Sequence, residues 1–172
     1  MTNGIKVKKR NGSIESLDLE KMHKMVDEAC KDLAGVSASQ VEMQSGIQFY
    51  DGVTTAEIQE ILIRSASDLI SLDNPNYQFV AARLLLFSLR KSLFGRMHET
   101  PKFFDHITKC VKLGVYDKEI LDNYTEEEIA TVERFIDHER DYLFTYAGLR
   151  QVVDKYLVQD RSTGQVYESF NR

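Results

Sequence analysis

The chain has 172 residues, enough to bury one good core or two small ones and too few for a large multidomain enzyme. Its 42% hydrophobic and 28% charged residues are close to the globular average, which excludes a disordered tail or a fibrous repeat. The 22 Lys and Arg against 27 Asp and Glu give a formal net charge of −5, and neither half is strongly basic. We therefore expect no nucleic-acid partner.

The two cysteines, Cys30 and Cys110, are too few for a disulfide framework or a four-thiolate zinc site. Both fall inside helical patterns, which predicts small core residues in a reducing, cytoplasmic environment. The longest apolar run covers only residues 84–87, and the N-terminus has no apolar signal-peptide region. We expect a soluble protein that is not exported and has no membrane partner.

Residues 5–17 have the pattern of a β-hairpin. Apolar and polar residues alternate on both sides of Asn11-Gly12, a pair that readily takes the positive φ angles of a tight turn. The period then changes to that of a helix, with Asp18 as the expected N-cap. One helical face carries the apolar positions Leu19, Met22, Val26, Ala29, Cys30 and Leu33.

The next two predicted helices follow closely. Ser37 is a candidate N-cap for a helix that includes Val41, Ile47 and Phe49 and ends at the turn pair 51–52. A Thr at position 54 or 55 is then expected to open a helix that runs to Leu69.

A longer helix is predicted over residues 77–94, with Asn74 as its N-cap and Pro75 at its first helical position. Its apolar residues lie on several sides, which makes it the expected central helix. The segment 95–101 is the one plausible boundary between two modules. Beyond it the pattern predicts, in order, helices over 103–114, 117–123, 125–136 and 146–157, and a hairpin over 158–167.

A search for catalytic groups finds no nucleophile elbow, no Walker-type phosphate loop and no zinc-protease helix. The four histidines are scattered, and we interpret them as surface or helix-end residues. Residues 135–141 crowd an imidazole among carboxylates, which allows a metal site. Helical spacing turns His138 away from Asp137 and Asp141, so a charged helix end is the favoured interpretation.

The N-terminal basic cluster carries more information. A tight hairpin holds residues 8–10, Lys-Lys-Arg, at its turn, where a fixed backbone presents cations to phosphate oxygens. Lys21 lies about one turn into the next helix, and Lys91 lies at the end of the predicted central helix. A solvated basic edge strand would explain Lys6 and Lys8 alone, but not the other cations.

These residues resemble the ATP-cone, a small regulatory nucleotide-binding module. The resemblance rests on residues 7–13 with Glu15, on Leu19 and Lys21, on 51–55 and on 87–91. Further matches extend it to the N-terminal region of the large subunit of class I aerobic ribonucleotide reductase. They lie at residues 47–52, 77–84, 124–128, 135–138 and 155–159.

The resemblance implies a mainly α fold with small β-hairpins (α+β). An ATP-cone of four helices capped by a hairpin would cover residues 1–95. A helical segment with a terminal hairpin would cover 96–172 and lead into a ten-stranded α/β barrel. Because the catalytic cysteines of the family lie in that barrel, we expect this stretch to be regulatory and to reduce no ribonucleotide by itself.

The same resemblance implies ATP or dATP as an allosteric effector, bound with Mg²⁺. It places triphosphate contacts at Lys9, Arg10, Lys21, Thr55 and Lys91. It places adenine and ribose contacts at Val7, Glu15, Asp18, Met22, Ile58, Gln59 and Phe87. Asp18 stands where the family frequently has Asn, and Gln59 where it frequently has His.

The implied partners are the remaining reductase barrel, the radical-generating small subunit and further copies of the parent. In the family, dATP drives an inactive assembly, so inhibition by dATP is expected. One alternative is a cone-bearing transcriptional repressor, which would carry a four-cysteine zinc ribbon before the cone. Another is a nucleotide-binding or helical interaction module without a regulatory switch.

Overall fold

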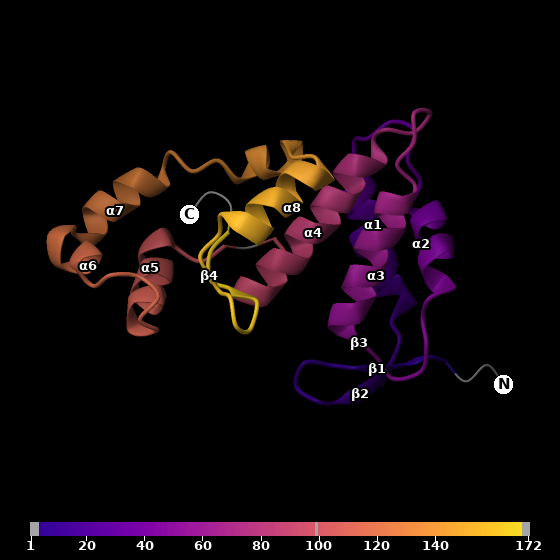
Figure 1. Ribbon diagram of the computed structural model, residues 1–172, viewed down its shortest axis with the longest axis horizontal. Coiled ribbons are helices and arrows are strands. Elements are labelled where there is room, and N and C mark those ends of the chain that lie inside the picture. Colours follow the sequence, from indigo (N-terminus) through magenta and orange to yellow (C-terminus); the bar gives the residue numbers. More distant parts are fainter. Residues whose placement is uncertain (1–3, 99, 170–172) are drawn as a thin grey trace. The chain divides into compact units, whose positions relative to one another are not determined.

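The computed structural model describes residues 4–98 and 100–169, which are mainly helical with two small sheets (Figure 1). This confirms the predicted α+β class. The described residues form two compact units, unit 1 (residues 4–88 and 144–149) and unit 2 (residues 89–98, 100–143 and 150–169). The division into domains at residue 95 stays a prediction. In the described residues, every helix is too short or too polar to span a bilayer.

The N-terminal hairpin is confirmed, with strands β1 (Lys6–Lys8) and β2 (Ile14–Ser16) pairing antiparallel. Its turn is closed by bonds from Lys9 N to Ser13 O at 2.8 Å and from Gly12 N to Lys9 O at 2.9 Å. Gly12 has the positive φ, 85°, that its place in the turn requires. A third strand, β3 (Val53–Thr54), pairs parallel with β1 and was not predicted.

Helix α1 (Leu19–Cys30) begins as predicted, because the Asp18 side chain accepts a hydrogen bond from Lys21 N at 2.9 Å. Helix α2 (Ala38–Gly46) is shorter than predicted. It follows Ser37, whose side chain makes no capping bond, and it ends before Ile47 and Phe49. Including those two residues in the helix was wrong: Gly46 favours an end, and Ile47 is 83% exposed, so nothing rewards another turn.

Helix α3 (Thr55–Asp68) starts from a complete capping box between Thr54 and Glu57. Helix α4 (Tyr77–Phe94) has the predicted bounds. Pro75 lies in a turn before it, so placing Pro75 at its first helical position was wrong. Asn76 directly precedes the helix: its carbonyl accepts a bond from Val80 N at 3.4 Å, and its side chain donates to Ala34 O at 2.8 Å. The core of unit 1 is built from apolar side chains of these elements, including Val26, Val41, Val53, Leu62, Ile63, Val80 and Leu86.

Unit 2 contains α5 (Phe103–Lys112), α6 (Glu119–Asn123) and α7 (Glu126–Glu133), with the predicted capping box between Thr125 and Glu128. The predicted second hairpin is also present, as β4 (Gln159–Asp160) and β5 (Gln165–Val166). Helix α8 (Tyr146–Lys155) is the last helix of the described chain.

Two expectations for unit 2 were wrong. Helix α7 ends before residues 135 and 136, and a 3-10 segment, η1 (His138–Leu143), follows. The Asp137 side chain accepts from Glu139 N at 3.0 Å, a local bond that competes with helix continuation. His106 is not a surface residue: it is 4% exposed, and its ring makes edge contacts with Phe94 and Tyr116.

Candidate nucleotide-binding site

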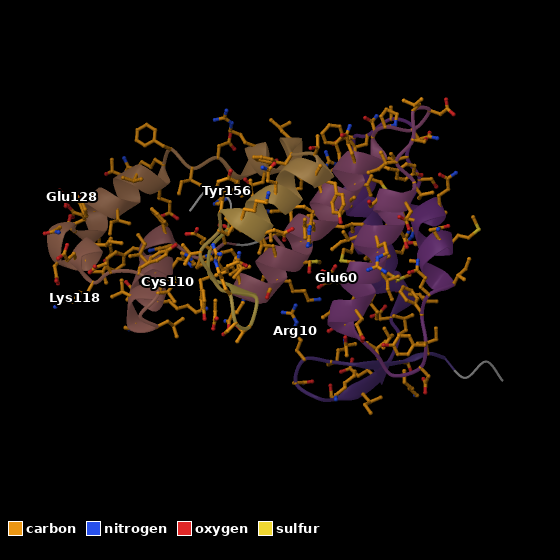
Figure 2. All side chains as sticks on the ribbon, viewed as in Figure 1. Arg10, Glu60, Cys110, Lys118, Glu128 and Tyr156 are labelled. Atoms are coloured by element: carbon orange, nitrogen blue, oxygen red, sulfur yellow. The ribbon has the colours of Figure 1, made fainter. Side chains whose placement is uncertain are left out.

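The hairpin turn presents two of the predicted phosphate ligands. The Lys9 ammonium lies 3.3 Å from Glu15 Oε2 across the hairpin, so a carboxylate already neutralises part of its charge. Arg10 is exposed, and its side chain extends outward from the turn (Figure 2). Glu15 therefore acts first as the partner of Lys9 in this structure.

The parallel pairing of β1 with β3 brings the start of α3 beside these cations. Val7 pairs with Val53 and Lys8 with Thr54, so Thr55 directly follows the strand beside Lys9. Two further bonds fix the approach to β3, from Lys6 N to Asp51 Oδ1 and from Gly52 N to Lys6 O, both at 2.8 Å. The first turn of a 14-residue helix thus lies next to the basic turn.

A helix N-terminus attracts anions, because its first N–H groups lack intrahelical partners and the helix dipole is positive there. Thr54 and Glu57 satisfy part of this end. Hydrogen bonds from the Thr54 backbone, from its side chain and from the Tyr50 hydroxyl lower the pKa of Glu57. Thr55 is the first helical residue and is partly buried. The sequence predicted that a threonine at position 54 or 55 opens this helix. It did not predict that Glu57 and Tyr50 lie beside the site.

The first turn of α1 carries three more predicted ligands. The Asp18 carboxylate is engaged as the helix cap, so its acceptor capacity is shared with Lys21 N. The Lys21 side chain is exposed, and Met22 is partly buried. The Lys21 side chain is therefore in contact with solvent, whereas the Asp18 carboxylate already accepts the hydrogen bond that caps α1.

Three of the predicted adenine contacts in unit 1 are buried. Val7 is 3% exposed, Ile58 7% and Phe87 0%, so all three are core residues of the unit in this structure. Any face that they offer to a ligand lies under other protein atoms. Core packing explains the burial of these three residues as well as a role in nucleotide binding does.

Gln59 is different, because a core position does not favour a primary amide. The residue is 5% exposed, and its Oε1 accepts a hydrogen bond from Ser88 Oγ at 3.2 Å. Its Nε2 is buried and has no hydrogen-bond partner among the described residues. A buried donor left in this state costs about 1 to 3 kcal/mol, and a ligand acceptor would remove that cost.

Lys91 lies four residues beyond Phe87 on α4, so the two share one face of the helix. It belongs to unit 2 and occupies the last turn, where a cation also complements the helix dipole. Among the described residues, His, Cys, Asp and Glu form no cluster of three suited to a metal ion. Asp141, a candidate for such a cluster, is instead the ion-pair partner of Arg90.

A basic turn beside a helix start is one of the arrangements that bind polyphosphates. Residues 5–92 match the ATP cone domain. The chain belongs to the ATP-cone family. An ATP cone is a nucleotide-binding regulatory domain, so the matched residues, which include every predicted site residue, form such a domain.

Much longer proteins share this region. The chain is 50% identical over 169 residues to the ribonucleoside-diphosphate reductase 1 subunit alpha of Escherichia coli. It is 47% identical to the subunit alpha of Haemophilus influenzae over 169 residues and 45% identical to that of Enterobacteria phage T4 over 167 residues. These matches cover 96 to 98% of this chain and 22% of each relative, so the chain spans about a fifth of their length.

Proposed function

We propose that the chain is the N-terminal regulatory region of the large subunit of a class I ribonucleoside-diphosphate reductase. In this role it binds ATP or dATP, with Mg²⁺, and adjusts the production of deoxyribonucleotides by the whole enzyme. The matched family and the identity of about one residue in two support the proposal. The observation that carries it is the β1–β3 pairing, which sets Lys9 and Arg10 beside the start of α3.

The electrostatics of this corner suit a triphosphate. Lys9, Arg10 and Lys21 come from two neighbouring elements, and the α3 N-terminus adds backbone N–H donors. Arg contributes a planar fork that can bind two phosphate oxygens, and Lys contributes a compact charge. Mg²⁺ bound to the phosphates would offset the remaining negative charge without requiring a protein cage. The phosphate contact at Lys91, in the last turn of α4, stays a prediction from the resemblance.

The other end of the nucleotide requires an apolar wall and a few directed polar groups. Met22 is partly exposed and supplies apolar surface directly, whereas Val7, Ile58 and Phe87 are buried and would line the site only after neighbouring side chains move. The Gln59 amide supplies a donor that lacks a partner among the described residues. A ring nitrogen or a ribose oxygen is a suitable acceptor for it. Glu15 and Asp18 can accept from the adenine amino group or a ribose hydroxyl.

Within the parent enzyme, this region would act with the catalytic barrel of the same polypeptide and with the radical-generating small subunit. Regulation through assembly would involve further copies of the large subunit. The site of action would be the cytoplasm, where ribonucleotides are reduced.

The test is isothermal titration calorimetry of the chain with ATP and Mg²⁺. Lys9→Ala combined with Arg10→Ala should abolish measurable binding, because it removes both cations of the turn. Lys6→Ala is the control, since it removes a charge from the same hairpin away from its turn and should retain binding. An unchanged affinity in the double variant would show that the site is misplaced.

A further inference from the structure

Ser88 on α4 makes one hydrogen bond to a buried residue of the proposed site. Its Oγ donates to Gln59 Oε1 on α3 at 3.2 Å, and both residues belong to unit 1. Gln59 is 5% exposed, whereas Ser88 is partly exposed. The bond holds one end of the Gln59 amide. The other end, Nε2, is buried without a hydrogen-bond partner among the described residues.

Packing alone is a weak explanation for this arrangement. An apolar side chain of similar length would fill the same volume without leaving a buried donor unpaired, and such donors are rare in folded proteins. An amide with one end held and the other end unpaired is suited to a ligand that brings the missing acceptor. The unpaired Nε2 therefore indicates the chemistry of its partner, which is an oxygen or nitrogen with a free lone pair.

The position of Gln59 on α3 connects this donor to the proposed nucleotide site. Gln59 lies four residues after Thr55, so the two side chains share one face of the helix and are about 6 Å apart along its axis. A nucleotide with its phosphates at the first turn of α3 and its nucleoside along this face brings ribose and ring acceptors to Gln59. Neighbouring side chains must move to admit the nucleoside, and the new hydrogen bond offsets part of that cost.

We propose that Ser88 is a positioning residue for Gln59. Its hydroxyl holds one end of the buried amide, so that the other end, Nε2 in this structure, meets an acceptor on the nucleoside of a bound nucleotide. Ser88 touches no ligand itself and acts only through Gln59. The inference rests on the proposed function, from which it takes a nucleotide bound at α3.

A positioning role and a general packing role differ in their effect on two ligands. Tripolyphosphate carries the phosphates of ATP without a nucleoside, so it cannot use the Gln59 amide. If Ser88 only stabilises the fold, its variants weaken the binding of ATP and tripolyphosphate alike. If Ser88 positions Gln59, they weaken ATP binding alone, and the effect disappears once the amide is removed.

The experiment measures the affinities of ATP and of tripolyphosphate, each with Mg²⁺, by calorimetry of the full chain. Ser88→Ala removes the hydroxyl from a partly exposed position and leaves Gln59 in place. We expect it to lower ATP affinity about threefold to tenfold, the scale of one neutral hydrogen bond, and to leave tripolyphosphate affinity unchanged. Ser88→Thr keeps a hydroxyl and should bind ATP as the unaltered chain does. In a Gln59→Met background, Ser88→Ala should cause no further loss.

The control is Ser92→Ala, the same substitution at an exposed serine one turn further along α4. It should change neither affinity. Unchanged ATP affinity in Ser88→Ala would overturn the inference, and so would an equal loss for both ligands or a loss that persists in the Gln59→Met background. If the unaltered chain binds no ATP, the proposed function itself fails, which is a separate result.

Discussion

Ser88 on α4 and Gln59 on α3 share one hydrogen bond, 3.2 Å from Ser88 Oγ to Gln59 Oε1. Because a serine hydroxyl can donate or accept, turning the amide over would let Nε2 donate to Ser88 and would leave Oε1 without that bond. In either orientation, Ser88 satisfies one end of a nearly buried amide and leaves the other end for a further partner. This is the feature of the core that packing explains least.

The first prediction follows from that amide. Gln59→Met keeps the length of the side chain and removes the buried polar atoms, so the unfolding temperature of the free chain should stay equal or rise. ATP affinity should fall about fivefold to twentyfold, because one directed hydrogen bond is lost. Thermal melts with and without ATP measure both effects. A variant that is less stable and binds ATP normally would assign Gln59 to packing alone.

The second prediction concerns the cap of α3. Hydrogen bonds from the Thr54 backbone and side chain lower the pKa of Glu57, so its carboxylate stabilises the folded chain above the ordinary glutamate pKa. That stabilisation is lost as the pH falls through the lowered folded pKa. Glu57→Gln keeps the capping geometry and removes the titration, so its unfolding free energy should fall less between pH 6 and pH 3, values chosen to bracket the ordinary pKa of about 4.3.

Urea unfolding at several pH values tests this expectation. Glu60→Gln is the control, because Glu60 is an exposed carboxylate on the same helix outside the capping box (Figure 2). The Glu60→Gln variant should keep the acid sensitivity of the unaltered chain. If Glu57→Gln keeps it as well, the cap does not supply the pH dependence.

The features that the sequence predicted well depend on neighbouring residues. The caps at Asp18 and Thr125 were predicted, and the cap at Thr54 was narrowed to Thr54 or Thr55. Each joins a side chain to a backbone N–H three residues away, so the residue types carry the signal. The hairpin at Asn11 is equally local. The basic turn was predicted for the same reason, since its cations are consecutive.

The features that the sequence missed depend on distant residues. Strand β3 has two residues, too few for an alternating pattern, and exists because β1 lies beside it. The bond between Arg90 and Asp141 joins positions 51 apart, and neither residue type indicates the other. Residues 135–141 were read as a helix end, although their course is set by η1 and that buried pair.

The third prediction concerns Cys30. Burial, and then the charge of Asp27, raise the pKa of this thiol to about 11, so it is almost entirely protonated near neutral pH. In a Cys110→Ala background, its alkylation by iodoacetamide should accelerate about tenfold per pH unit up to about pH 10 without levelling, because the thiolate is the nucleophile. Asp27→Asn should raise the rate at fixed pH. Levelling near pH 9 would indicate an ordinary, solvated thiol.

The last prediction concerns the choice between ATP and dATP, which differ by one ribose hydroxyl. The phosphates supply most of the electrostatic attraction, and the apolar surfaces of Val7, Ile58 and Phe87 lose nothing when that hydroxyl is absent, so dATP should bind at least as tightly as ATP. An effector changes activity only if it binds two states of the enzyme with different affinity, a difference of typically about 1 to 3 kcal/mol. We expect dATP to provide that difference and to inhibit the intact parent reductase, with Gln59 as the residue most able to weaken the contrast with ATP.

Calorimetry of the chain gives the two affinities, and titration of the parent with dATP should show activity falling as assembly size changes. Full activity and an unchanged assembly at saturating dATP would mean that this cone binds its nucleotide without switching the enzyme.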